Sequence, residues 1–579
     1  MLSKDDKYII TIFFFISLSL QLIVLDSHPI SISVDSFSYI KSNASMRPHG
    51  YDLYLLLTGI KIFDSILLSI LLQLFFVSLV PVILFLSFKK LNRYAAILVP
   101  IIFFFYTYPY VMSSQIMSES IFIFGCSLII FFLINYSTNQ STKNLILLLT
   151  CLFITNEIRQ SLILLYPAII LSILAIYFGN NSRIILKHLV ATLLVAIMHI
   201  SFGSLSIKLD YKSAGPIPDK TIKIPFINFH FNPHKNSRNM APFFAIHSMS
   251  SLKFIDWEKK GILDQKYFLN PSNGINSKIF YEKIRELLSD KNFFYNMASN
   301  RSIVGTKTNI RTDFLDHNNQ TISKLADDIF YNRQLTPHRW PQLAQHMYNI
   351  YGYKETGHLL RGLIFEAIQK NYKLFGKSHL ANLYGNLLVS SFHDELFYYF
   401  IPDEYDFNNY AELLNLFPLS SSAYSSWLYQ MDAVVGNDNY KLNGLNPVND
   451  WPYRNDYFYR IPSFKDIFLP FIKISESQSI MAYHLHGNKF ALPNYVLSST
   501  NRAFIIISFI IMPILIFLTF FSKMRILSLS ILISGILIMN LSCLISTGPR
   551  QICMFMIFFA PLYATAIDGF NRIFKKIKS

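Results

Sequence analysis

The sequence has little cysteine, with four residues in a chain of 579. All four lie in or at the edge of apolar runs, at Cys126, Cys151, Cys543 and Cys553. Disulfide frameworks and cysteine-based zinc sites need sets of thiols at recognisable spacings. The sequence therefore predicts neither a disulfide framework nor a zinc site built on cysteine.

Charge is almost missing from the apolar runs, where His199 is the main ionisable residue. Coupled ion transporters bury carboxylates or basic groups near the middle of the membrane. This absence argues against ion pumping and favours chemistry at a membrane surface.

What the chain has in excess is apolar sequence. It is 52% hydrophobic with 53 Phe, and its mean hydropathy is +0.34. A membrane-crossing helix needs about 20 apolar residues, and ten runs of roughly this kind predict about ten spans. They lie at 8–25, 65–88, 95–108, 121–135, 145–155, 161–178, 188–202, 503–521, 526–545 and 552–567. The fold class predicted is mainly α, a polytopic helix bundle.

The placement of lysine and arginine predicts the orientation of these spans. The first run follows Lys4 and Lys7 and lacks a small-x-small cleavage site, so we interpret it as a retained signal anchor. With the N-terminus in the cytoplasm, fourteen basic residues lie in inner segments and five in short outer loops. The inner residues are Lys4, Lys7, Lys89, Lys90, Arg93, Lys143, Arg183, Lys187, Lys523, Arg525, Arg572, Lys575, Lys576 and Lys578, and the outer ones Lys41, Arg47, Lys61, Arg159 and Arg550. This ratio favours a multi-pass protein with both termini cytoplasmic.

Three parts follow from this pattern: a membrane part at 1–204 with about seven spans, a polar part at 205–501, and a membrane part at 502–579 with about three spans and a basic tail. The first outer loop is 26–64, and the polar part is predicted to lie outside the cytoplasm. Apolar residues recur at three- and four-residue spacing in 280–299 and 358–388, which predicts a mostly helical domain with little sheet. The net charge is +16, and much of the excess positive charge lies either in the cytoplasmic segments or in this domain, so it gives no support for nucleic-acid binding.

The loop after the first apolar run is unusually rich in ionisable and shape-setting residues. Asp35, Arg47, His49 and Tyr51 fall within a short polar connection at a membrane face. Such density indicates a site. Three further outer-loop residues, Glu119, Arg159 and Arg550, are predicted to face the same side.

Five short segments of these loops together resemble the GT-C class of membrane glycosyltransferases, which includes the protein mannosyltransferase and aminoarabinose transferase families. The segments are D-S-F-S-Y (35–39), R-P-H-G-Y (47–51), S-E-S-I-F (118–122), N-E-I-R-Q (156–160) and G-P-R-Q-I (548–552). The likeness covers roughly the first 205 residues and the last segment, and leaves out the polar part.

The resemblance implies a hexosyl or pentosyl transferase of the bacterial inner membrane that takes its sugar from a polyprenyl phosphate. The acceptor would be a hydroxyl of a cell-envelope glycan or lipid, such as lipopolysaccharide, outside the cytoplasm, and the reaction would be inverting. Asp35 is the candidate base, and a carboxylate within reach of a hydroxyl can serve so. Arg159 and Arg550, with Arg47 beside them, are candidates for the leaving phosphate, because guanidinium groups bind phosphate well.

The remaining candidates have supporting roles. Glu119 would orient the acceptor or assist Asp35, and His49 and Tyr51 would contact substrate. Some relatives place a second acid directly beside the first, whereas Ser36 follows Asp35 here. A divalent metal therefore has no support, and no cofactor is predicted.

Each candidate also has a structural interpretation. Asp35 and Glu119 are good acids for a helix N-terminus, Arg47 precedes a proline and fits a turn, and Arg159 and Arg550 can reach lipid headgroups. Two histidine pairs have metal-compatible spacing but fit surface or loop positions better, at 230/234 and 484/486.

Two rival functions use the same architecture. An O-antigen ligase or polymerase would depend on loop arginines and a histidine and be indifferent to Asp35. A lipid-linked glycan transporter would need a polar path through the spans, which the span sequences do not supply.

Overall fold

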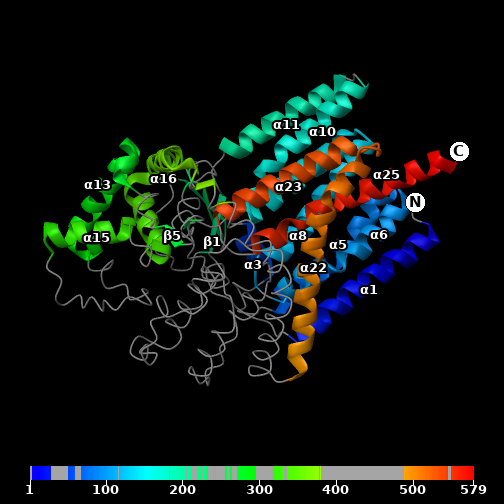
Figure 1. Cartoon of the computed structure of the whole chain (residues 1–579), viewed down its shortest axis with the longest axis horizontal. Helices are drawn as coiled ribbons and strands as arrows, with labels where there is room; N and C mark the ends of the chain where they lie inside the picture. The colour runs from blue at the N-terminus through cyan, green and yellow to red at the C-terminus, as the bar shows by residue number, and fades with distance from the viewer. Residues whose placement is uncertain are drawn as a thin grey trace.

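A computed structural model describes residues 3–27, 50–58, 67–201 except 115 and 181–182, 270–294, 317–331, 336–373, 488–545 and 550–578 (Figure 1). It also describes five short strands between 205 and 263 and isolated positions beside these ranges. The described chain is mainly helical, as predicted.

Most of the described helices form one bundle. In chain order they are α1 (Lys4–Ser27), α3 (Gly50–Leu57), α5 (Leu67–Lys89), α6 (Arg93–Phe103), α7 (Tyr108–Met112), α8 (Glu119–Thr138), α9 (Thr142–Ile158), η1 (Gln160–Leu164), α10 (Leu165–Asn180), α11 (Arg183–Ser201), α22 (Asn488–Thr519), α23 (Arg525–Ile545), α24 (Arg550–Phe555), η5 (Met556–Phe559) and α25 (Ala560–Lys578).

Length and composition mark this as a membrane protein. Five helical segments are long and apolar enough to cross a bilayer: Lys4–Val24, Leu68–Lys89, Glu119–Thr138, Arg183–Ile200 and Ile552–Lys578. Four more apolar helices are shorter, at Arg93–Phe103, Leu162–Phe178, Ala503–Thr519 and Arg525–Asn540. The span predicted at 95–108 is shorter in the structure, because α6 ends at Phe103. A separate short helix, α7, begins at Tyr108.

The two parts of the chain that form the bundle share one core. A single cluster of buried apolar residues includes Phe103, Phe504 and Phe558. Helix α10 packs against α23, and α6 packs against α25. The Tyr106 hydroxyl donates to the carbonyl oxygen of Cys553, and the rings of Tyr106 and Phe504 stack with centroids 5.6 Å apart. Residues far apart in sequence therefore complete each other's packing.

One end of the bundle gathers basic residues, and we call it the basic end. There α5 ends at Lys89, whose ammonium group donates a hydrogen bond to Asp6 at the start of α1. Lys90 bonds Asn135 at 2.8 Å near the end of α8, and Arg93 begins α6. Both chain termini lie at this end, away from the helices of the polar part (Figure 1).

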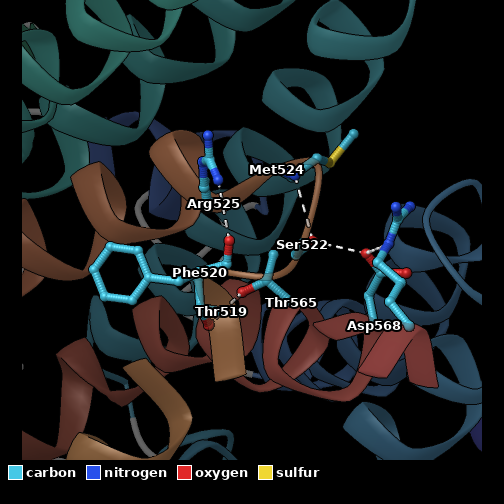
Figure 2. Close-up of polar contacts among 8 residues, drawn as sticks. Thr519, Phe520, Ser522, Met524, Arg525, Thr565 and Asp568 are labelled. Atoms are coloured by element: carbon cyan, nitrogen blue, oxygen red, sulfur yellow. Dashed lines mark hydrogen bonds and ion pairs between the residues drawn. The ribbon is translucent and has the colours of Figure 1, made fainter. Parts of the chain in front are cut away.

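The turn between α22 and α23 is held at the basic end by α25. Ser522 donates to Asp568 at 2.8 Å, and Thr519 and Thr565 bond at 3.0 Å (Figure 2). Arg572 also donates to Asp568, at 2.9 Å and one helical turn away. A Cβ added at Gly569 would lie 1.9 Å from the carbonyl oxygen of Leu518, so α22 and α25 approach here at glycine distance.

The polar part contains small sheets and a separate helical core. Strands β1 (Leu205–Leu209), β2 (Lys220–Ile224) and β3 (Ile227–Phe231) form an antiparallel sheet in the order β1-β3-β2, and β4 (Phe254–Asp256) pairs with β5 (Gly261–Leu263). His230 lies in β3, and residues 234, 484 and 486 lie outside the described residues. Helices η3 (Pro271–Asn273), α13 (Ile275–Ser289), α15 (Asn319–Tyr331) and α16 (Thr336–Lys370) follow.

The two amphipathic helices predicted in the polar part are present with shifted bounds. The prediction at 280–299 corresponds to α13, which begins earlier and ends at Ser289. The first part of the prediction at 358–388 corresponds to the second half of α16, which is kinked at Gly352 with φ +79°, whereas residues 380–388 lie outside the described residues. Their apolar faces meet in a second buried cluster that includes Phe280, Leu287 and Leu360.

Candidate functional site

A buried ion pair joins the start of α8 to the end of α9 at the end of the bundle opposite the basic end, which we call the site end. Arg159 Nη1 lies 3.0 Å from Glu119 Oε1. The Glu119 side chain is 1% exposed and the Arg159 side chain 21%. The carboxylate is thus sealed inside the bundle, whereas solvent or a ligand can reach the guanidinium.

The ends of both helices explain why these residues meet. Glu119 is the first residue of α8, where the helix dipole favours a negative charge. Arg159 ends α9 with extended backbone. The two helices pack closely through Gly125, where an added Cβ would lie 2.4 Å from Thr155 Oγ1. That close approach sets the register that places Glu119 opposite Arg159.

The segment R-P-H-G-Y reaches the same place through α3. An added Cβ at Gly50 would lie 2.6 Å from the carbonyl carbon of Glu157 and 2.8 Å from the backbone nitrogen of Ile158. Only a glycine lets the chain approach the end of α9 at this distance without displacing it. Gly50 therefore lies against the turn that carries Arg159.

Tyr51, predicted as a substrate contact, is buried next to this glycine. Its hydroxyl donates to Gln73 Oε1 at 2.8 Å, and Gln73 Nε2 donates to the carbonyl oxygen of Ser113 at 3.2 Å. Its ring stacks on that of Tyr54, with centroids 5.5 Å apart. These contacts join α3 to α5 and to the residues after α7.

A second polar cluster, which the sequence did not single out as a site, supports the last turn of α9. Asn156 Nδ2 lies 2.8 Å from His199 Nε2, and the Tyr166 hydroxyl lies 2.9 Å from His199 Nδ1. His199 Nε2 is also 3.9 Å from Glu157 Oε1. The available signals were a lone histidine in an apolar run and the asparagine of N-E-I-R-Q, but their partnership depends on how α11 packs.

The last of the five segments, G-P-R-Q-I, leads into α24. Arg550 is the first residue of this helix, and its side chain is outside what the structure describes. The helix packs against α7 and α8, and the rings of Phe555 and Phe122 meet edge to face with centroids 5.8 Å apart. The backbone at Arg550 thus begins an element that contacts the helix of Glu119.

Asp35, Arg47 and His49 lie outside the described residues, so their predicted roles stay predictions. Among the described residues, no group of three or more His, Cys, Asp or Glu side chains is placed to hold a metal ion. What the described part of the site offers is a partly exposed guanidinium held by a buried carboxylate, an arrangement suited to binding an anion.

Comparison of the chain with protein-family models, with curated proteins and with solved structures finds no match.

Proposed function

We propose that the protein is a membrane glycosyltransferase of the GT-C type, which transfers a sugar from a polyprenyl phosphate to a hydroxyl of a cell-envelope glycan or lipid. One observation carries this proposal. The segments R-P-H-G-Y, S-E-S-I-F and N-E-I-R-Q are far apart in sequence, yet Gly50, Glu119 and Arg159 converge at one end of the bundle. Helix α24, which begins at Arg550 of the segment G-P-R-Q-I, packs against α8, the helix that begins at Glu119.

The proposal includes a topology of about ten spans in a bacterial inner membrane. Its support is the basic end, where Lys89 and Arg93 lie with both chain termini. With that end in the cytoplasm under the positive-inside rule, the site end and the polar part lie outside. The donor and the acceptor would then meet at the extracytoplasmic surface.

The proposed reaction is a single displacement at the anomeric carbon of the donor sugar. Asp35 takes the proton of the acceptor hydroxyl, whose oxygen forms a bond to that carbon. The bond between the carbon and the phosphate oxygen breaks, and the polyprenyl phosphate leaves with the negative charge. Attack opposite to the leaving group inverts the configuration.

Arg159 stabilises the leaving phosphate in this scheme, with Arg550 and Arg47 as further candidates. A guanidinium held in place before the reaction needs no rearrangement as charge develops. Because Glu119 is buried and paired with Arg159, its proposed role changes from assisting Asp35 to fixing the guanidinium. The ion pair thus prepares a phosphate-binding group.

The test is transfer by purified protein in nanodiscs, with a panel of polyprenyl-phosphate hexoses and pentoses. We expect the unaltered chain to release polyprenyl phosphate and Asp35→Asn to lose this activity. The matched control is Asp5→Asn, because Asp5 is an exposed acid of the basic end, 3.6 Å from Arg93. Full activity of Asp35→Asn would overturn the base assignment and favour a ligase-like enzyme, and no donor consumption by the unaltered chain would overturn the function.

A further inference from the structure

The last turn of α9 is held from three sides. Helix α8 holds it through Glu119 and Arg159, α3 through the close contact at Gly50, and α11 through His199 and Asn156. Asn156 lies three residues before Arg159, which is about one helical turn. Any rotation or fraying of this turn therefore moves the arginine.

His199 makes the most directional of these contacts. Since Asn156 Nδ2 can only donate, the nitrogen at 2.8 Å, Nε2, accepts, and Nδ1–H donates to the Tyr166 hydroxyl at 2.9 Å. The ring also meets Phe153, with centroids 5.0 Å apart and planes at 42°. The His199 side chain is 4% exposed, so loss of either hydrogen bond would leave a buried polar group without a hydrogen-bond partner.

The same helix carries a second buried histidine that serves as an internal reference. His188 lies near the start of α11, where Nδ1 is 3.0 Å from the Tyr136 hydroxyl and Nε2 is 3.1 Å from Thr142 Oγ1. Its partners are at the end of α8 and the start of α9, at the basic end. The two histidines thus join α11 to its neighbours by similar bonds, and only His199 is next to the proposed site.

We infer that His199 is a positioning residue, which fixes the turn of Asn156 and thereby orients the Arg159 guanidinium toward the donor phosphate. The inference rests on the proposed function and deepens it. It predicts that the histidine acts through its bond to Asn156 alone, without contact to the substrate. A displacement of a binding group by about 1 Å can cost about a hundredfold in rate, so a support of this kind has a measurable effect.

Three substitutions separate the two bonds of the ring. His199→Phe keeps a ring and removes both bonds. In His199→Gln the side-chain amide reaches the position of Nε2 and can keep the bond to Asn156. In His199→Asn the shorter amide mimics Nδ1 and can keep only the bond to Tyr166. His188→Phe is the matched control at the other end of α11.

The measurements are KM for the polyprenyl-phosphate sugar, KM for the acceptor, and binding of unsubstituted polyprenyl phosphate to protein in nanodiscs. For His199→Phe and His199→Asn we expect the donor KM and the phosphate dissociation constant to rise about tenfold, with the acceptor KM unchanged. His199→Gln should stay within about threefold of the unaltered chain, and His188→Phe should not change. Unfolding midpoints of all four variants control for folding.

The outcomes distinguish this inference from the function on which it rests. Equal behaviour of the Gln and Asn variants, or a donor KM unchanged in both His199→Asn and His199→Phe, would overturn the positioning role while leaving the transferase intact. If the unaltered chain transfers no sugar but binds polyprenyl phosphate in a manner that depends on His199, the function fails and the positioning role stands. If it neither transfers nor binds, both are overturned.

Discussion

Each end of the bundle contains a buried acid paired with an arginine, and the pairs are built differently. At the basic end Asp568 and Arg572 are one turn apart on α25, and Asp568 also accepts from Ser522 (Figure 2). At the site end Glu119 and Arg159 come from the termini of two helices. The first pair is local to one helix, whereas the second exists only when α8 and α9 are packed together.

The surroundings of the pairs differ in the same sense. Beside Asp568, hydroxyl groups of Thr519, Thr565 and Ser528 join α22, α25 and α23 in one chain of hydrogen bonds. Beside Arg159, the contacts are instead those of Asn156, His199 and Tyr166, which join α9, α11 and α10 around one imidazole ring. A buried ion pair contributes little net stability by itself. We therefore regard the basic end as a brace that holds helices together and the site end as a device that holds one guanidinium in place.

The largest effect is expected from Gly569→Ala at the basic end. The new Cβ would lie 1.9 Å from the carbonyl oxygen of Leu518, so α22 and α25 must separate. Overpacking against backbone costs about 3 kcal/mol, and the midpoint of thermal unfolding in nanodiscs should fall clearly. Gly376→Ala is the control, because nothing lies within 4 Å of its added Cβ. An unchanged midpoint for Gly569→Ala would contradict the brace.

Gly50→Ala makes the same change at the site end with a different expected result. Its Cβ would lie 2.6 Å from the carbonyl carbon of Glu157, and the short α3 can move away more easily than α22. We expect a smaller drop in the unfolding midpoint than for Gly569→Ala, and a loss of transfer of about tenfold or more, because the turn of Arg159 loses one support. The comparison of the two ends fails if Gly50→Ala lowers the unfolding midpoint as much as Gly569→Ala and leaves the transfer activity of the folded protein unchanged.

Arg159→Lys and Arg572→Lys test the two arginines directly. Lysine keeps the charge but not the planar fork that binds phosphate through two hydrogen bonds. At Arg159 we expect transfer to fall about a hundredfold with little change in unfolding, since one preorganised donor group is commonly worth that much. At Arg572 we expect activity near that of the unaltered chain. Equal losses for the two variants would show that Arg159 has no special role.

The sequence predicted the helical class and the positions of most apolar helices, because runs of apolar residues are a strong local signal. It also predicted that Glu119 and Arg159 share one side of the bundle. It could not predict their pairing, nor that His199 holds Asn156, because both depend on the register of packed helices. That register is set by single close approaches, such as Gly125 against Thr155, which no periodicity reveals.

The smallest effect is expected at Glu366 of α16. Its carboxylate accepts hydrogen bonds from amide groups and a hydroxyl group, whereas the carboxylates of Glu119 and Asp568 pair with arginines. Glu366 accepts from the backbone nitrogens of Asn276 and Ser277 and from both side chains, at 2.7 to 2.8 Å, and so joins α16 to the start of α13. Partial burial raises the pKa of Glu366, but these hydrogen bonds outweigh it and lower the pKa below its usual 4.5. A carboxylate with a lowered pKa stabilises the fold above about pH 4.5, and this contribution is lost as the pH falls through the lowered value.

We therefore expect the amides of α13 in the full chain to exchange faster as the pH falls below 4.5, after correction for intrinsic exchange. Glu366→Gln should lose about 1 kcal/mol of local protection at pH 7 and show no such pH dependence, because the amide cannot titrate. Glu282→Gln is the control, since Glu282 is an exposed glutamate of α13, the helix whose amide exchange is measured. If Glu366→Gln keeps the pH dependence, another group is responsible. A clear effect would show that a carboxylate can join two helices without an arginine, in contrast to Glu119, which is paired with Arg159.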